Sequence, residues 1–453
     1  MAKSSPLEKI PLILALLCGL AAYSNSFRGP FIFDDIDAIA GNPSFQPSAT
    51  HSNASSPTTL SGRPVLWLSF EIDNALGGLH VEIYHITNLL IHLAAGAVLY
   101  GIVARTLLNM GNRFEASAHW LAAAVTAIWL VHPLNTEAVT YTIQRAESLA
   151  GLFYLLVIYC VIRNWRFGAI AACALGMGTK ETMVTAPILA LLYDRTFLAG
   201  SFAGAWKSRR TIYIGLVATW AIVIIAALSG ARKMSVGDIS PIDYAMTQLG
   251  VIWHYLVLTF WPHSLVLDYY DWPITARASD IAAGGIIIVL LMILTLLSLR
   301  LWPRLGFLGA WFFLVLAPSS SVIPIFTEVA AEHRMYLPLI ATIVLVVVGG
   351  WMVISRRPAT AWIGGVAFTI VLALLSARTF VRNAQYQDPE ILWRDNIAQR
   401  PLNPRAHFNL GFTLMTENRP SEAAIEFQKA LALDPHYYAA MHWLFVIDSR
   451  RAK

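Results

Sequence analysis

The stretch Phe31-Ile-Phe-Asp-Asp-Ile-Asp37 follows the first strongly apolar segment of the chain, which ends near Tyr23. Two adjacent carboxylates, Asp34 and Asp35, are therefore expected at or near a membrane surface. Ionisable groups where a hydrophobic span meets water are costly to desolvate and commonly serve a function. The alternative interpretation is a solvated loop that turns before Pro43. We interpret the stretch as the start of a functional site on a membrane-embedded chain.

The composition indicates an integral membrane protein. Of the 453 residues, 57% are hydrophobic and 13% are charged, whereas soluble domains carry about 25% charged residues. The net charge of +5 is small and is explained by loops between apolar segments, so no nucleic-acid partner is expected. The three cysteines lie in apolar runs, which predicts neither a disulfide framework nor a metal site.

Apolar segments of sufficient length predict eleven membrane spans, the shorter ones packed inside the protein. They lie near residues 10–24, 84–105, 118–131, 146–162, 167–179, 182–194, 211–229, 282–300, 304–318, 336–354 and 360–380. Arginine and lysine gather in alternate loops, which places those loops and the N-terminus in the cytoplasm if the apolar stretch 247–262 does not cross. The first span is expected to be an uncleaved anchor. We therefore predict an all-α polytopic membrane domain over residues 1–382, with 25–83 as its first external loop.

The unusual polar residues then fall on the external side, which predicts one extracytoplasmic site. Besides the acidic pair, they include Glu137, Arg145, Lys180, Glu181 and Arg334. Another external loop carries Asp268-Tyr-Tyr-Asp271, and its aromatic residues are expected to anchor at the membrane interface.

The acidic pair suits glycosyl transfer to a hydroxyl group, because a base must take the acceptor proton as the anomeric bond breaks. One of Asp34 and Asp35 would be that base, and the other would orient the acceptor or bind a cation. Glu137 is a candidate third member of this acidic cluster. A divalent metal such as Mg²⁺ needs more ligands than the loop supplies. Metal-dependent and metal-free versions both stay open, and no cofactor is otherwise predicted.

The external cations suit the phosphate of a lipid-linked donor, since Arg offers paired hydrogen-bond donors and Lys a compact charge. Arg334 is the first candidate for a phosphate clamp, followed by Lys180 and Arg145. The alternatives are pairing of Lys180 with Glu181, pairing of Arg145 with Glu147, or snorkelling of the arginines to lipid headgroups.

After Arg382 the charge rises and the long apolar runs stop, so residues 383–453 form an external tail. Seven of its residues fit the 34-residue tetratricopeptide pattern, namely Leu410, Gly411, Leu414, Ala423, Phe427, Ala430 and Pro435. His407 stands where tryptophan is usual. A single repeat does not bury its own faces, so the tail is expected to pack against residues 383–400, the membrane domain or a partner.

Four motifs together resemble the transmembrane and tetratricopeptide-repeat O-mannosyltransferases. They are Phe33-Asp-Asp-Ile-Asp-Ala-Ile39 with Asn42, His132-Pro-Leu-Asn-Thr-Glu-Ala138 with Arg145-Ala-Glu147, Lys180-Glu181, and Glu332-His-Arg-Met-Tyr-Leu-Pro338. The resemblance implies a GT-C glycosyltransferase fold that moves a sugar from a polyprenyl-phosphate carrier to protein Ser or Thr outside the cytoplasm. It also implies that the acidic pair carries the base and its partner. The residues it assigns to substrate or carrier binding are Glu137, Arg145, Lys180, Glu181 and Arg334.

The eukaryotic members of that family carry long repeat arrays, whereas this tail has little more than one repeat. The short array and lean loops favour a bacterial inner-membrane enzyme with undecaprenyl phosphate as carrier, and with site and tail facing the periplasm. The predicted reaction transfers a mannose-like hexose with inversion. The alternatives are the same chemistry on a lipid or polysaccharide acceptor, a transporter with ionisable residues inside its spans, and a non-catalytic membrane scaffold.

Overall fold

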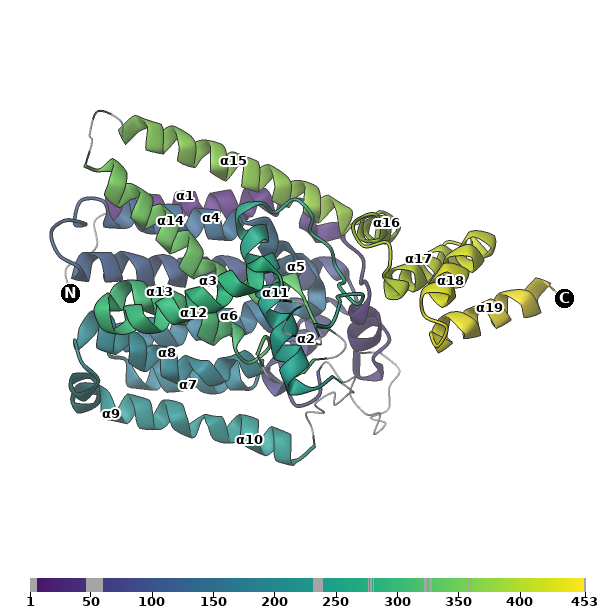
Figure 1. Cartoon of the computed structure of the whole chain (residues 1–453), viewed down its shortest axis with the longest axis horizontal. Helices are drawn as coiled ribbons and strands as arrows, with labels where there is room; N and C mark the ends of the chain where they lie inside the picture. Colours follow the sequence, from purple (N-terminus) through teal and green to yellow (C-terminus); the bar gives the residue numbers. More distant parts are fainter. Residues whose placement is uncertain are drawn as a thin grey trace.

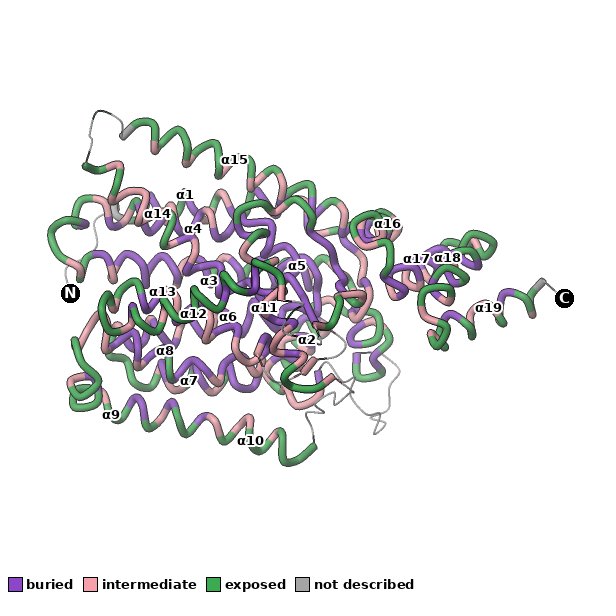
Figure 2. The backbone as a smooth tube through the Cα atoms, in the orientation of Figure 1, coloured by how far each residue is buried: buried purple, intermediate pink, exposed green. Residues whose placement is uncertain are grey.

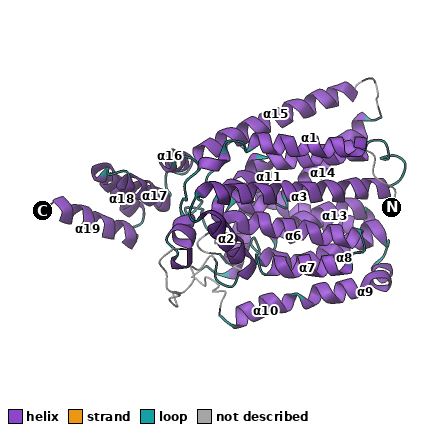
Figure 3. Cartoon of the chain, turned by 180° about the vertical axis from the view of Figure 1, so that it is seen from behind, coloured by secondary structure: helices purple, strands orange, loops and turns teal. Residues whose placement is uncertain are grey.

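A computed structural model describes residues 6–45, 60–230, 239–275, 277, 279, 281–321, 324–325, 328–356, 359 and 361–451. Regular structure in these ranges is entirely helical (Figure 3). A bundle contains α1 (Pro6–Ala22), α3 (Val81–Asn109), α4 (Ala118–Val131), α6 (Arg145–Ile162), α7 (Arg166–Met177), α8 (Ala186–Tyr193), α9 (Phe202–Ala218), α10 (Trp220–Leu228), α12 (Ala283–Leu301), α13 (Pro303–Leu316), α14 (Leu339–Ile354) and α15 (Ala361–Gln385). The tail contains α16 (Pro389–Gln399), α17 (Pro404–Thr416), α18 (Pro420–Leu433) and α19 (Tyr438–Arg451).

The bundle helices run along the long axis of the molecule, and the tail projects beyond one end (Figure 1). We call this end the tail end and the opposite one, where the chain begins, the far end. Neighbours in sequence pack against each other, as in α3 with α4, α6 with α7 and α12 with α13. Three further helices, α2 (Pro64–Gly77), α5 (Thr136–Thr140) and α11 (Pro241–Phe260), lie toward the tail end.

Five helices are long and apolar enough to cross a membrane, at Val81–Asn109, Thr142–Ile162, Phe202–Leu228, Ala283–Leu301 and Trp362–Gln385. Five shorter apolar helices coincide with further predicted spans, at Lys9–Ala22, Ala118–Val131, Arg166–Met177, Pro303–Leu316 and Leu339–Ile354. The remaining predicted span, 182–194, is only an eight-residue helix, α8, preceded by a 3-10 turn. Helices therefore form where spans were predicted, and the count of eleven crossings stays a prediction.

The outer surface of the bundle suits a lipid environment. Large apolar side chains of α12, such as Leu290, Leu294 and Leu297, are exposed, and Figure 2 shows exposed residues along the outer helices. Exposed tryptophans stand at or just before the starts of five helices that run from the far end toward the tail end, namely Trp120, Trp165, Trp206, Trp302 and Trp362. Tryptophans gathered at one level are typical of a membrane interface.

Helix α11, which includes most of the stretch predicted not to cross, lies along the loop between α13 and α14. Tyr244 Oη donates to the carbonyl of Ser319 at 2.9 Å, and Gln248 Nε2 donates to that of Val329 at 2.9 Å. Further along the helix, Tyr255 Oη accepts the backbone N–H of Ala331 at 2.7 Å. The helix thus braces a loop of the tail end.

The tail packs in the first two of the three ways expected for an incomplete repeat array. Helix α16 packs against α17, and one hydrophobic core joins tail residues to the first loop and α2. This shared core includes Ile32, Ile39, Phe45, Leu66, Phe70, Tyr141, Trp393, Ala406, Leu410 and Phe427. Within the repeat, a Cβ on Gly411 would lie 2.7 Å from the ring of Phe427, so the close helix contact requires glycine. His407 uses its Nδ1 to bind Glu426 Oε2 at 2.7 Å.

Candidate active site

Asp34 and Asp35 form a helical turn between Phe33 and the π-helix Ile36–Ala40. Phe33 has a φ angle of 47°, a left-handed conformation that residues other than glycine seldom adopt. Such strain gathers at functional sites, because surrounding packing must hold it. Adjacent side chains on helical backbone diverge by about 100°. The two carboxylates consequently face different surroundings.

Asp35 is turned into the protein and is fully buried. Its Oδ1 accepts the backbone N–H of Ile143 at 2.7 Å, and its Oδ2 accepts that of Ile32 at 3.2 Å. Burial raises the pKa of Asp35 to about 8, although these backbone donors act in the opposite direction. Both oxygens are occupied, so Asp35 fixes the first loop against the segment that follows α5.

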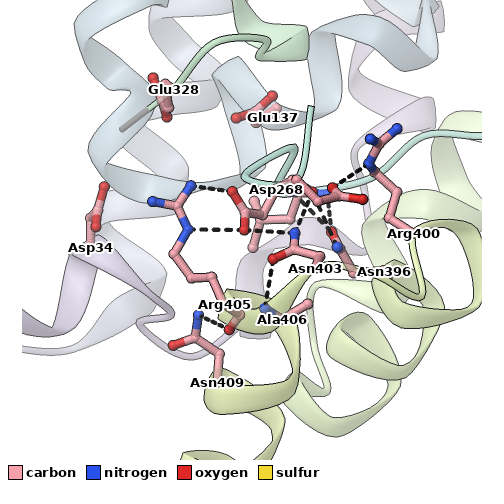
Figure 4. Close-up of polar contacts among 12 residues, drawn as sticks. Asp34, Glu137, Asp268, Glu328, Asn396, Arg400, Asn403, Arg405, Ala406 and Asn409 are labelled. Carbon is pink, nitrogen blue, oxygen red and sulfur yellow. Dashed lines mark hydrogen bonds and ion pairs between the residues drawn. The ribbon is translucent and has the colours of Figure 1, made fainter. Parts of the chain in front are cut away.

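Asp34 is partly exposed and faces Arg405 and Glu328 (Figure 4). Its backbone N–H donates to Tyr141 Oη at 2.9 Å, and its carboxylate receives no hydrogen bond from any described residue. Burial raises the pKa of Asp34 to about 6, the charge of Glu328 adds to the rise, and Arg405 opposes it. A carboxylate of this pKa, with both oxygens available, can accept a proton near neutral pH.

Glu137 is committed to His333 rather than to the first loop. Its Oε2 accepts the backbone N–H of His333 at 2.9 Å, and its Oε1 lies 2.7 Å from Nδ1 of that residue. His333 Nε2 lies 3.8 Å from Oε2 of Glu328. Glu328, in the loop between α13 and α14, was not singled out from the sequence, and its charge acts on Asp34. The acidic cluster therefore includes Glu328, and His333 stands between it and Glu137.

Lys180 and Glu181 do not pair with each other, contrary to the alternative considered from the sequence. Lys180 has extended backbone, with φ −152° and ψ 150°, which directs neighbouring side chains to opposite sides. Lys180 Nζ instead lies 2.8 Å from Glu147 Oε1, and its side chain keeps 13% exposure. Glu181 pairs with Arg63 at 3.0 Å.

Arg145 is fully buried and binds protein groups on every side of its guanidinium. It forms an ion pair with Asp73 of α2, not with Glu147. Its Nε donates to Asn88 Oδ1, and its planar group lies 4.3 Å from the centre of the Phe70 ring. With no exposed surface, Arg145 joins α2, α3 and α6 and does not reach open space in this conformation.

Arg334 is also buried, and it binds main-chain carbonyl groups of its own loop. Its Nη1 donates to Ser319 at 3.2 Å and to Val329 at 3.1 Å, and its Nη2 donates to Glu328. A guanidinium that holds three carbonyl groups shapes the loop that carries Glu328. The role of Arg334 as a phosphate clamp stays a prediction.

The segment Asp268-Tyr-Tyr-Asp271, expected to anchor at the membrane interface, binds the tail instead. Arg405 of α17 forms a two-point ion pair with Asp268, with Nε at 2.9 Å from Oδ2 (Figure 4). Arg400 Nε lies 2.6 Å from Oδ1 of Asp271. A tail cation, Arg405, therefore lies beside the acidic cluster. The sequence did not predict Arg400 and Arg405 as partners of these aspartates.

The described part of the chain has no obvious metal-binding site. No group of three or more His, Cys, Asp or Glu side chains there is arranged to hold a metal ion. We accordingly derive no chemical step through a metal.

Comparison with known proteins bears out the resemblance found in the four motifs. The tetratricopeptide repeat family matches residues 404–437. Protein O-mannosyl-transferase TMTC1 of Homo sapiens is 25% identical over 97% of this chain, and Protein O-mannosyl-transferase F38B6.6 of Caenorhabditis elegans is 23% identical over 94% of it. The chain spans 57% and 63% of the length of these two relatives. Over nearly its whole length, the chain is thus similar to the TMTC protein O-mannosyl-transferases.

Proposed function

We propose that this protein is a membrane glycosyltransferase that moves a mannose-like hexose from a polyprenyl-phosphate carrier to Ser or Thr hydroxyls of an exported protein. The supporting observation is that the carboxylates of Asp34 and Asp35 lie in different surroundings. Asp35 is occupied by backbone donors, whereas Asp34 presents a carboxylate without hydrogen-bond donors among the described residues. The similarity to O-mannosyl-transferases supports the sugar and the acceptor class.

In the proposed reaction Asp34 is the general base. The acceptor hydroxyl oxygen attacks the anomeric carbon, its proton passes to Asp34, and the bond from that carbon to the carrier phosphate oxygen breaks. Attack from the face opposite the leaving group inverts the anomeric centre. At neutral pH a group of pKa about 6 is mostly ionised and ready to accept the proton. Asp35 acts as the partner that fixes the direction of Asp34.

The leaving carrier phosphate needs positive charge close by, because its own negative charge grows as the bond breaks. Lys180, Arg334 and Arg405 all act on the Glu328 carboxylate and, with His333, hold its pKa below its usual range. The same positive field favours a phosphate. Lys180 is the direct contact we assign, because its side chain keeps some exposure, whereas the guanidinium of Arg334 is bound to carbonyl groups of its own loop and contributes charge only.

The same geometry supports a proposal for placement in the membrane. We assign eleven crossings, with the N-terminus and the far end in the cytoplasm and the acidic site and tail in the periplasm of a bacterium. The clustering of the ionisable groups at one end of the bundle supports this assignment over a transporter, whose site would lie near the bilayer midplane. The exposed tryptophans of the far end would mark the cytoplasmic interface.

The test is glycoproteomics on a strain that lacks this protein, complemented with wild type, Asp34→Asn or Asp37→Asn. Asp37 lies exposed in the same turn and serves as the matched control. We expect a hexose-modified Ser or Thr peptide that returns with wild type and Asp37→Asn and stays absent with Asp34→Asn. Absence of any affected peptide, with a change in a glycan or lipid, would move the acceptor to those classes. If neither peptides nor glycans and lipids change, the remaining interpretation is a non-catalytic membrane scaffold.

A further inference from the structure

Several side chains of the tail bind one residue of the candidate-site loops, Asp268. Asn396 Oδ1 accepts the backbone N–H groups of Leu267 and Asp268 at 3.0 and 2.9 Å. Asn403 Nδ2 donates to Asp268 Oδ2 at 2.9 Å, and Arg405 completes the set with its two-point ion pair. Two of these tail side chains, Asn403 and Arg405, thus bind the carboxylate of Asp268, and Asn396 binds its backbone. Such a buried, charge-assisted network fixes the tail in a single orientation.

Tail residues also hold the strained turn that aims Asp34. The guanidinium of Arg405 lies 5.3 Å from the centre of the Phe33 ring. Trp393 of α16 meets that ring edge-on, with centroids 5.5 Å apart, and Tyr141 stacks on it at 6.4 Å. The left-handed backbone of Phe33 is unfavourable unless its side chain is held. Of these three neighbours of the Phe33 ring, Arg405 and Trp393 come from the tail.

The charges that face Asp34 come from four elements. They are Glu328 from the loop before α14, Arg405 from α17, Asp268 from the segment before α12, and Asp37 from its own turn. Tyr141 approaches from the segment after α5 through its hydroxyl. Arg405 alone among the four charged groups favours the ionised form of Asp34.

We propose that Arg405, although it belongs to the repeat tail, is a positioning residue of the transfer step that holds the Phe33–Asp34 turn and keeps Asp34 in its proton-accepting form. This inference rests on the proposed function. It assigns the tail a part in the chemistry itself, in addition to any binding of acceptor proteins. Docking of the tail or recruitment of acceptors does not require a cation beside Asp34.

Substituting either partner of the Arg405–Asp268 ion pair tests the proposal. Both substitutions break the pair and loosen the tail to a similar degree. Loss of Arg405 removes a positive charge near Asp34, whereas loss of Asp268 removes a negative one. The experiment measures kcat/KM against pH for the full-length protein in vesicles, with polyprenyl-phosphate hexose and the acceptor peptide found by glycoproteomics. We expect Arg405→Gln to move the acidic limb to higher pH by about one unit. Asp268→Asn should move it to lower pH, and Arg405→Lys should leave it near that of wild type.

Arg394→Gln is the matched control, since Arg394 lies in α16 with a 52% exposed side chain and pairs with Glu390 only 2.6 Å away. We expect its pH profile to coincide with that of wild type. The proposal is overturned if Arg405→Gln and Asp268→Asn move the limb in the same direction, or if neither moves it. If Arg405→Gln does not fold, Asp268→Asn decides by itself: a shift to lower pH supports the proposal, and no shift or a rise overturns it.

A second readout separates this inference from the proposed function, because it needs no substrate. Dicyclohexylcarbodiimide reacts with protonated carboxyl groups in apolar surroundings, and peptide mass spectrometry locates the adduct on Asp34. Labelling should fall as pH rises through the pKa of Asp34, and the fall should occur at higher pH in Arg405→Gln. If the wild type transfers no sugar and the labelling curve of Arg405→Gln still lies at higher pH, the function is contradicted and the effect of Arg405 on Asp34 is supported. Labelling curves that coincide would contradict that role.

Discussion

Nδ1 of His333 lies 2.7 Å from Oε1 of Glu137, and this contact joins two loops whose residues are 196 positions apart in the chain. Both side chains are buried, and the same carboxylate also accepts the backbone N–H of His333. The contact sets the position of the loop that carries Glu328 beside Asp34. The packing of two distant loops, as much as the acidic pair itself, shapes the candidate site.

Glu137→Ala should destabilise the protein by about 1–3 kcal/mol, because it leaves a buried backbone N–H and imidazole without their acceptor. The loss can be measured as a lower midpoint of thermal unfolding in detergent, and transfer should fall as the Glu328 loop loosens. Glu417→Ala removes an exposed tail carboxylate and is the control. A midpoint equal to that of wild type would show that the contact is dispensable.

The two aspartates should respond differently to removal of their charge. Asp34→Asn should abolish transfer with little change in thermal stability, because its carboxylate supports no hydrogen bond from the described residues. Asp35→Asn replaces one acceptor oxygen by a donor facing a backbone N–H, so it should lower stability by about 1–3 kcal/mol and reduce transfer in part. The reverse pattern, with an inactive and stable Asp35→Asn, would assign the base to Asp35.

The rate of transfer should depend on pH through Asp34. Burial raises the pKa of this carboxyl to about 6, so below that pH the protonated form dominates and no base is available. We expect kcat/KM to fall about tenfold per unit below pH 6 and to level off above it. Initial rates between about pH 5 and pH 8 test this. A flat profile, or a rate that rises with acid, would exclude Asp34 as the base.

Arg145 and Asp73 should behave as a structural pair. Removing either partner leaves an unpaired charge in a buried site, at a cost of about 3–5 kcal/mol. Arg145→Ala and Asp73→Ala should therefore each lower the unfolding midpoint strongly, and the double variant should lose less than the sum of the two. Additive losses would mean that the residues are not coupled. An unchanged midpoint with a raised donor KM would restore the carrier-binding role predicted for Arg145.

Lys180 should contribute directly to donor binding. Lys180→Ala removes the ammonium group that we assign to the carrier phosphate, on a partly exposed side chain, and we expect a loss of about 10²-fold in kcat/KM for the lipid-linked donor. Lys180→Arg should retain part of the activity because it keeps the charge. Lys207→Ala, at the far end in α9, is the control. Activity of Lys180→Ala equal to that of the control would remove this residue from the site.

The helices were predictable from the apolar runs. A run that is nearly long enough to span a bilayer as a helix has few other ways to fold. Side-chain partners were harder to predict. Extended backbone at Lys180 separated it from Glu181, and the Arg405–Asp268 pair spans 137 positions. One signal was available in the sequence: Asp73 is an acidic residue in an apolar stretch, and such a group needs a cation. That rule would have pointed to Arg145.

The core shared by the first loop and the tail has a consequence for biogenesis. The first loop is synthesised early, yet Trp393 and Ala406, which complete the apolar surroundings of that loop, are synthesised near the end. At about 5–20 residues per second the loop waits tens of seconds for these partners. The candidate site is therefore incomplete until synthesis is nearly finished, and a truncated product would carry an uncovered apolar loop, open to proteolytic quality control.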